Sequence, residues 1–197
     1  MFQELRASLG LFLFLFLVTG VAYPLCVTFL GQALFPYQAH GSLVVDAGKI
    51  VGSALIGQAF SGEAYFHSRP SYAGNGYDAA NSSGSNLAPT SSNFIAAVTE
   101  RVEKLRLDDA VRSIPVDLVT ASGSGLDPDI SVDAARFQAA RIAKVRSLPL
   151  AEVERLIVAH ITPRTFGFLG EKRINVLALN QALDTLSSPS SPAAETP

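Results

Sequence analysis

The chain has 197 residues, with 15 lysines and arginines against 17 aspartates and glutamates, a formal net charge of −2, and a single cysteine. This near balance lacks the basic excess with which proteins bind nucleic acid, so nucleic acid is excluded as a partner. One cysteine allows neither an intrachain disulfide nor a cysteine cluster for zinc. A folded domain in this chain must therefore be stabilised by its apolar core.

The N-terminal segment predicts a transmembrane helix. No charged side chain occurs between Arg6 and Asp46, and residues 9–35 are almost wholly apolar. At about 1.5 Å per residue this helix reaches about 40 Å, against a hydrocarbon core of about 30 Å. A cleaved signal peptide is the alternative, but its apolar region usually covers only about 7–15 residues behind a basic start. We therefore expect a permanent span at 9–35 behind a short cytoplasmic N-terminus, residues 1–8.

Basic residues on either side of the span predict its orientation. Arg6 precedes it and the next basic residue is Lys49, which favours a cytoplasmic N-terminus and an extracytoplasmic main domain. Within the span, small residues that permit close approach of another helix recur at helical spacing, at Thr19, Ala22 and Cys26. Pro24 lies among them and can kink the helix, a defect that neighbouring protein tolerates better than lipid. The strip is either a docking face for partner helices or an incidental feature of a lone anchor.

The soluble domain is predicted to cover residues 38–186 and to begin with strands. Short β-branched runs at 42–45 and 49–60 are bounded by turn residues, as strands usually are. The segment "GEAYFHSRP" predicts one more extended piece, which ends at its proline. The strands are therefore expected to precede the helices.

A long polar segment follows at residues 67–93. It consists almost entirely of Ser, Gly, Asn, Ala, Pro and Tyr, without an apolar period. Loops of this length are uncommon in compact domains and are usually functional or disordered. The segment contains Arg69, Tyr72 and Tyr77, and exposed tyrosines are typical of interfaces. The loop is either a partner- or ligand-binding element or a tolerated insertion.

Four amphipathic helices are predicted after the loop, because apolar residues recur at intervals of three and four. Their apolar faces are Phe94, Ile95, Val98, Val102 and Leu105; Val132, Ala135, Ala139 and Ile142; Val153, Leu156, Ile157 and His160; and Val176, Leu179, Leu183 and Leu186. Between the first two helices, "SIPVDLVTAS" predicts a strand. Residues 187–197 have no apolar face and predict a disordered tail. The fold class is α+β, or loosely α/β, behind one transmembrane helix.

The stretch "VTASGSGLDPDIS", residues 119–131, combines hydroxyls, glycines and acids as active sites and phosphate loops do. Neither Ser122 nor Ser124 has the G-x-S-x-G surroundings of a hydrolase nucleophile, so a membrane-anchored serine hydrolase is a remote alternative. The acids also lack the spacing of a calcium loop. We expect a turn into a helix that Ser131 or Asp129 caps. The residues left as exposed contacts are Ser122, Ser124 and Asp127.

Six motifs occur along the chain in a fixed order. They are "GQALFPYQAHGSL", "VGSALIGQAF", "YFHSRPS", "SGSNLAP", "VTASGSGLDPDIS" and "LGEKRINVLALNQAL". Together they resemble the KdpC family, the C subunit of the Kdp-type potassium-transporting ATPase of bacteria and archaea. The resemblance implies a non-catalytic accessory subunit in the cell (inner) membrane, with the channel-forming A subunit, the ATP-hydrolysing B subunit and the small F subunit as partners. It also implies a catalytic chaperone that raises the pump's affinity for ATP.

Two roles follow from this resemblance. An extracytoplasmic domain meets little ATP, which favours assembly and stabilisation of the complex. The candidate partner contacts are Thr19, Ala22, Cys26, Arg69, Tyr72, Tyr77 and Asp127. The alternative is a nucleotide-binding module that uses Ser122, Ser124 and Asn86. Where many family members read "SGGSNL", this chain reads "SGSNL" at 83–87, which reduces the backbone freedom of a phosphate loop. No metal and no cofactor of its own is expected, and ATP is expected only through the complex.

Overall fold

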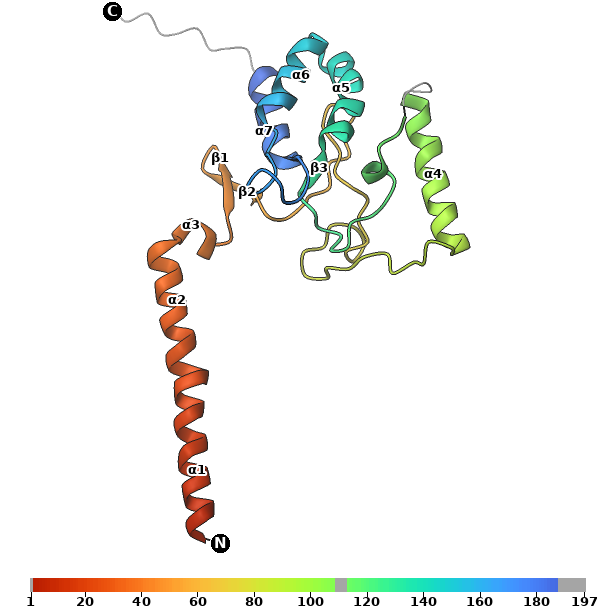
Figure 1. Cartoon of the computed structure of the whole chain (residues 1–197). Helices are drawn as coiled ribbons and strands as arrows, with labels where there is room; N and C mark the ends of the chain where they lie inside the picture. The colour runs from red at the N-terminus through yellow and green to blue at the C-terminus, as the bar shows by residue number, and fades with distance from the viewer. Residues whose placement is uncertain (1, 109–112, 188–197) are drawn as a thin grey trace, which may run out of the picture. The chain divides into compact units, whose positions relative to one another are not determined.

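The computed structural model describes residues 2–108 and 113–187 (Figure 1). The chain divides into two compact units, residues 1–51 and 52–197. The first contains the apolar helix, a short helix and most of a β-hairpin, and the second contains the remaining helices and a second pair of strands. The prediction of a mixed helix-and-strand fold with one N-terminal apolar helix is confirmed. The predicted disordered tail lies outside the described residues, apart from Ser187.

The N-terminal helix is interrupted by a π turn beside its proline. α1, Phe2–Leu17, continues through the π turn Val18–Ala22 into α2, Tyr23–Leu34. Pro24 occupies the first turn of α2, where its missing N–H and its ring are tolerated. The amide of Tyr23 donates to the carbonyl of Val18, five residues earlier. This π-type hydrogen bond keeps the helix connected next to the proline, which has no amide hydrogen to donate.

The whole helix Phe2–Leu34 is long and apolar enough to cross a membrane. It covers 33 residues with a hydropathy of 2.2 in its most apolar window. None of its described residues is buried by the rest of the chain. Its length and composition agree with the predicted span, and its start at Phe2 places the short N-terminal segment in the same helix.

A short helix and a hairpin follow the apolar helix. α3 is Pro36–Ala39, β1 is Leu43–Asp46 and β2 is Lys49–Ser53. The turn residues Ala47 and Gly48 both have positive φ, 46° and 79°, as the tight turns that match strand twist require. The strand predicted at 49–60 thus ends early, at Ser53.

The core of the second unit is formed by three helices and a small antiparallel sheet. The helices are α5, Val132–Arg146, α6, Leu150–Ala159, and α7, Val176–Ser187. The strands β3, Asp129–Ser131, and β4, Arg173–Asn175, pair with Ile130 opposite Ile174. Their apolar side chains form one buried cluster that includes Ile130, Ala135, Ala139, Ile142, Val153, Ile157, Ile174, Val176, Leu179 and Leu183. The helical faces predicted for these three helices are largely confirmed.

α4, Ser92–Asp108, differs from the other helices of this unit (Figure 1, green). Its predicted apolar face is only partly covered: Phe94, Val98, Val102 and Leu105 are half-buried, and Ile95 is 54% exposed. Leu105 alone of these packs against the core cluster. The helix therefore stands at the edge of the core and leaves space beside α5.

Two predicted strands are absent from the described structure. The stretch "SIPVDLVTAS" contains a 3-10 helix, Val116–Leu118, in place of the predicted strand. This segment contacts β3 through the carboxylate of Asp117, which accepts hydrogen bonds from the amide and the hydroxyl of Ser131. The piece "GEAYFHSRP" is not a strand either. Its Phe66 bonds through both N–H and C=O to the side chain of Asn180, at 2.9 and 3.0 Å, so an amide side chain takes the place of a neighbouring strand.

Candidate functional site

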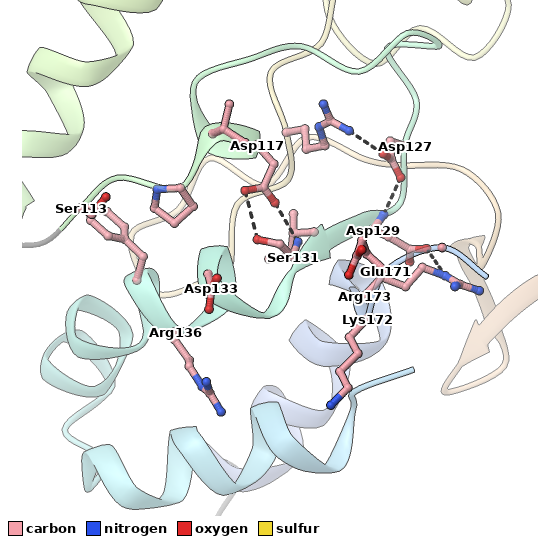
Figure 2. A pocket seen from close by; sticks show the side chains of 16 residues that line it. Ser113, Asp117, Asp127, Asp129, Ser131, Asp133, Arg136, Glu171, Lys172 and Arg173 are labelled. Atoms are coloured by element: carbon pink, nitrogen blue, oxygen red, sulfur yellow. Dashed lines mark hydrogen bonds and ion pairs between the residues drawn. The ribbon is translucent and has the colours of Figure 1, made fainter. Parts of the chain in front are cut away.

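An open cleft of about 940 Å³ lies where the two segments around β3 and β4 meet the start of α5 (Figure 2). Its charged lining residues are Arg69, Asp117, Asp127, Asp129, Asp133, Arg136, Glu171, Lys172 and Arg173. The antiparallel pairing of β3 and β4 brings together Asp129 and Arg173, which are 44 residues apart in the sequence. The cleft is therefore a product of the tertiary fold and carries charges of both signs.

Most of the acidic side chains shown in Figure 2 are engaged within the chain. Arg69 pairs with Asp127 at 3.1 Å, and Arg173 pairs with Asp129 at 3.0 Å. Asp117 accepts from the amide of Ser131 at 2.7 Å and from its hydroxyl at 3.1 Å. The arrangement fixes the cleft wall rigidly and leaves few carboxylate oxygens to receive a ligand.

Asp129 has a perturbed acidity. Burial raises the pKa of its carboxyl group above the usual value, and the neighbouring Asp127 carboxylate raises it further. The guanidinium of Arg173 lowers the pKa but does not cancel these effects. The folded chain therefore holds the proton on Asp129 to a higher pH than the unfolded chain does.

The cleft does not form a metal centre. Within the described ranges, no group of three or more His, Cys, Asp or Glu side chains is placed to hold a metal ion. The hydroxyl of Ser131 accepts from the amide of Ala134 at 3.0 Å and so caps α5, as the sequence predicted for Ser131 or Asp129. The chemistry of the cleft is that of ion pairing and positioning.

The histidines give no support to a serine hydrolase. A ring nitrogen of each lies within hydrogen-bonding distance of a local carbonyl: His40 of Pro36, His67 of Gly62 and His160 of Leu156. None of these three contacts is with a serine hydroxyl, which is the partner that a catalytic base needs. His160 also ends α6 as its C-cap, which accounts for its place on the predicted helical face.

The predicted nucleotide contacts lie on two loops that pack against each other. The amide of Ser83 donates to the carbonyl of Ser124 at 3.0 Å, and the hydroxyl of Ser82 donates to the same oxygen at 2.9 Å. The prediction that Ser122 is exposed is wrong, because this side chain is only 5% exposed in the fold, whereas Ser124 and Asn86 are exposed. None of these three predicted residues lines the large cleft. Their role as nucleotide contacts stays a prediction.

The single glycine of "SGSNL" has a packing role. A Cβ at Gly84 would lie 2.8 Å from the carbonyl oxygen of Gly123, which is closer than real Cβ atoms approach. Gly84 thus permits the two loops to touch. The hydroxyl of Ser124 accepts from the amide of Leu126, so it closes a turn within its own loop.

The residues predicted in the long polar segment stabilise that segment. Arg69 pairs with Asp127, and the hydroxyl of Tyr77 donates to the Arg69 carbonyl. Arg101 of α4 donates to the hydroxyl of Tyr72 at 3.2 Å and lies over its ring. Burial raises the pKa of Tyr77, with Asp127 adding to the effect. Arg69, Tyr72, Tyr77 and Asp127 therefore have structural partners, and their role in partner binding stays a prediction.

The π turn changes how the small residues of the apolar helix are spaced around its axis. Thr19 and Ala22 both lie within it, and Cys26 lies in α2. Because a π turn contains more residues than an α turn, it increases the angular separation of Thr19 from the other two. The hydroxyl of Thr19 donates to the carbonyl of Leu15 at 2.7 Å. Ala22 and Cys26 remain one turn apart on one face.

The residues that sequence reasoning missed are Asp117, Gln138, Arg173 and Asn180. Gln138 exchanges hydrogen bonds with the backbone of His67, as Asn180 does with Phe66. Both amides lie on otherwise apolar helical faces and are buried. A polar residue at a core position of an amphipathic pattern is the one signal that indicates such a partner.

Comparison with known proteins covers nearly the whole chain. A family profile described as K+-transporting ATPase, c chain (KdpC) matches residues 5–185. The KdpC subunit of the potassium-transporting ATPase of Gemmatimonas aurantiaca is 55% identical over 192 residues, covering 96% of each chain. That of Rhodospirillum rubrum is 55% identical over 93% of this chain and 96% of its own. That of Acidobacterium capsulatum is 58% identical over 85% of this chain and 90% of its own.

Proposed function

Since the chain belongs to the KdpC family, as its ordered motifs predicted, we propose that this subunit of the K+-transporting ATPase assists its assembly. In this proposal it stabilises the contact between the channel-forming and ATP-hydrolysing subunits, with the small F subunit as a further neighbour. It performs no phosphoryl transfer of its own.

The observation that carries this proposal is the uncovered surface of the apolar helix. None of the described residues of Phe2–Leu34 is buried, and the domain has a core of its own. The helix surface is therefore open to lipid and to helices of other subunits. Ala22 and Cys26, one turn apart, provide the small residues against which another helix can pack closely.

We propose a single-pass topology in the cell (inner) membrane. The position of Arg6 before the span and the absence of further basic residues before Lys49 support a cytoplasmic N-terminus. The domain that starts near Gln38 is then extracytoplasmic. On that side it meets the outer surface of the channel subunit, and Arg69, Tyr72, Tyr77 and Asp127 hold the long polar segment in shape for this contact.

The assembly role is tested in the membrane span. Ala22→Phe introduces a large ring on the small-residue face, while Val27→Phe places the same ring about 140° away at about 100° per residue. An interhelical contact of about 1–2 kcal/mol corresponds to about a tenfold loss of association. We expect Ala22→Phe to reduce co-purification of the channel and ATPase subunits in detergent about tenfold and Val27→Phe to retain it. Intact complexes with normal potassium-dependent ATP hydrolysis from both variants would disprove the role.

A narrower role, raising the pump's affinity for ATP, is the second candidate. The observation in its favour is that Ser124 and Asn86 are both exposed and lie on two loops that contact each other. We expect the double variant Ser124→Ala, Asn86→Ala to raise the KM for ATP of the assembled pump without loss of co-purification. Ser61→Ala, an exposed serine elsewhere, is the control. An unchanged KM for ATP would leave assembly as the function.

A further inference from the structure

A second cleft, of about 410 Å³, lies between α4 and α5. Its residues come from the segment 67–70, from α4, from the 3-10 helix and from α5. Small-ligand sites commonly have volumes of about 300–1,000 Å³, so the cleft is large enough for a small molecule. It forms because α4 stands at the edge of the core and covers α5 incompletely.

The charge of this cleft has one sign. Its ionised lining residues are Arg69, Arg101, Lys104 and Arg141, and His67 lies beside them. No aspartate or glutamate occurs among the described residues that line it. Like charges gathered in a concave, partly apolar surface reinforce one another's potential and attract an anion. The first cleft, by contrast, is lined by acids as well as bases, and Arg69, which pairs with Asp127, lines both clefts.

Neutral groups hold the guanidinium of Arg101 in place. It donates to the carbonyl of Val119 at 3.0 Å and to the hydroxyl of Tyr72 at 3.2 Å. These acceptors orient the group without neutralising its charge. A pre-oriented guanidinium is well suited to phosphate, whose oxygens match its planar set of donors.

The other cations differ in how firmly they are engaged. Arg69 pairs with Asp127, yet its Nε is buried without a hydrogen-bond partner in the described part of the chain. Lys104 pairs with Glu100 on the exposed surface of α4, one helical turn away. Exposed pairs of this kind are weak and are readily exchanged for a stronger anion. The cleft is thus lined by one guanidinium with a buried unsatisfied donor atom and by an ammonium group held only in an exposed pair.

The remaining wall is apolar and aromatic. Leu105, Leu118 and Phe137 line it, together with the ring of Tyr77. Leu118 and Phe137 belong to the buried core cluster, so this wall is preformed. A ligand that fills the cleft therefore carries an anionic group beside an apolar body.

We propose that the α4–α5 cleft is a binding site for a phosphate ester that carries an apolar body. Arg101, Lys104 and Arg69 contact the phosphate, and Leu105, Leu118 and Phe137 contact the apolar part. The same chemistry has two sources, a soluble phosphate ester such as a nucleotide and the headgroup region of an anionic phospholipid. The site lies apart from the serine loops that are the candidates for raising ATP affinity, and it does not depend on the assembly role.

The test uses the full chain purified in a neutral detergent. Its probes are adenosine monophosphate and inorganic pyrophosphate for the soluble source. Short-chain phosphatidylglycerol, with zwitterionic phosphatidylcholine as the comparison of zero net charge, is the probe for the lipid source. Calorimetric titration measures the Kd for each at low and at raised salt. We expect saturable binding of at least one phosphate probe that weakens with salt, because charge attraction contributes to it.

Two charge reversals locate the site. Lys104→Glu changes the cleft, and Lys144→Glu is its control, because Lys144 is an exposed lysine of α5 that does not line the cleft. We expect Lys104→Glu to raise the Kd about tenfold and Lys144→Glu to leave it within about twofold, while both retain the thermal unfolding midpoint of the parent chain. Arg101→Gln is expected to act like Lys104→Glu.

Each outcome decides the proposal or its source. Binding of adenosine monophosphate without a preference for phosphatidylglycerol over phosphatidylcholine identifies a soluble ester, and the reverse identifies a lipid headgroup. If no phosphate probe binds, or if Lys104→Glu and Lys144→Glu weaken binding equally, the proposal is overturned. Co-purification of the other subunits with Lys104→Glu is measured in parallel, so that a failure of this site and a failure of the assembly role are distinguished.

Discussion

The core of α5, α6 and α7 and the irregular segment from residues 54 to 91 are ordered by different interactions. In the core, apolar side chains such as Ile142 and Leu179 are fully buried against one another. In the irregular segment, backbone groups bond to side chains of distant elements, as Phe66 does to Asn180 and His67 to Gln138. The irregular segment also buries Phe66 in the core cluster, so the polar side chains that the core presents add to a small apolar anchor in ordering it.

This difference predicts how each region responds to mutation. The core responds to lost volume, since cavities remove contacts and apolar burial. The irregular segment responds to lost hydrogen-bond partners, since an unsatisfied buried amide costs free energy. The following substitutions test that comparison by unfolding the full chain in detergent with denaturant.

Leu179→Ala tests the core and has the largest expected effect. Leu179 is fully buried in the core cluster, and such truncations cost about 2–5 kcal/mol of unfolding free energy. Phe168→Ala is the control, because Phe168 is 71% exposed and is expected to change the unfolding free energy by less than about 0.5 kcal/mol. Equal effects of the two substitutions would contradict the burial of Leu179.

Asn180→Leu tests the polar link between the two regions. It keeps the branched shape of the side chain, with added volume, but removes both hydrogen bonds to Phe66, and we expect a loss of about 2–3 kcal/mol. Hydrogen exchange at the Phe66 amide is expected to rise at the same time. Asn75→Ala, at an exposed asparagine of the irregular segment, is expected to be neutral. A stabilised protein with a protected Phe66 amide would show that the link is dispensable.

Ser131→Ala tests the junction of β3 and α5. It removes two hydrogen bonds of the hydroxyl, the one accepted from the Ala134 amide and the one donated to Asp117. It leaves the hydrogen bond that the backbone amide of residue 131 donates to Asp117. The expected loss is about 1 kcal/mol. Ser131→Asp retains a capping oxygen but places a second carboxylate beside Asp117, so it is expected to be no better than alanine. If Ser131→Asp has the full unfolding free energy of the parent chain, the helix cap alone accounts for the stabilising effect of the Ser131 hydroxyl.

Asp129→Asn tests the electrostatics of the first cleft and has the smallest expected effect. The folded-state pKa of Asp129 is raised above the ordinary 3.8, so between these two pKa values the folded chain binds more protons than the unfolded chain. Its contribution to stability is therefore present at low pH and is lost as pH rises through the folded pKa. We expect Asp129→Asn to remove this decline from the pH dependence of the unfolding free energy.

The same substitution also removes the ion pair with Arg173, so the unfolding free energy at pH 7 is expected to change by less than about 1 kcal/mol. Glu154→Gln, at an exposed glutamate of α6, is the control for a change of net charge. If Asp129→Asn leaves the difference between pH 4 and pH 7 unchanged, the carboxyl group is not perturbed by its neighbours.

Patterns that act over a few residues were predicted well from the sequence. The apolar helix, the helices α5, α6 and α7, and the cap at Ser131 each depend on residues within a few turns of one another. Strands were predicted in part. The strands expected at 42–45 and at the start of 49–60 are confirmed as β1 and β2, although the second ends at Ser53. The stretch "SIPVDLVTAS" contains a 3-10 helix, β3 lies where a turn and a helix cap were predicted, and no strand was predicted at β4.

For the candidate sites, too, the sequence indicated single residues but not the contacts between them. The sequence indicated that Arg69, Tyr77 and Asp127 are important, but it could not show that they bind one another. It gave no sign of the clefts, because their walls come from segments far apart in the chain. Charge counts over the whole chain, which nearly cancel, also hide the all-basic lining beside α4.

The sequence by itself determined the family, the apolar helix and the amphipathic faces, because these depend on residue order and helical period alone. Only the tertiary structure decided that β3 pairs with β4, that Asn180 and Gln138 act as strand substitutes, and that one cleft is lined by charges of both signs and the other by cations alone among its charged residues. The physical reason is that hydrogen bonds and ion pairs require partners in space, and the closure of long loops, not local preference, brings those partners together.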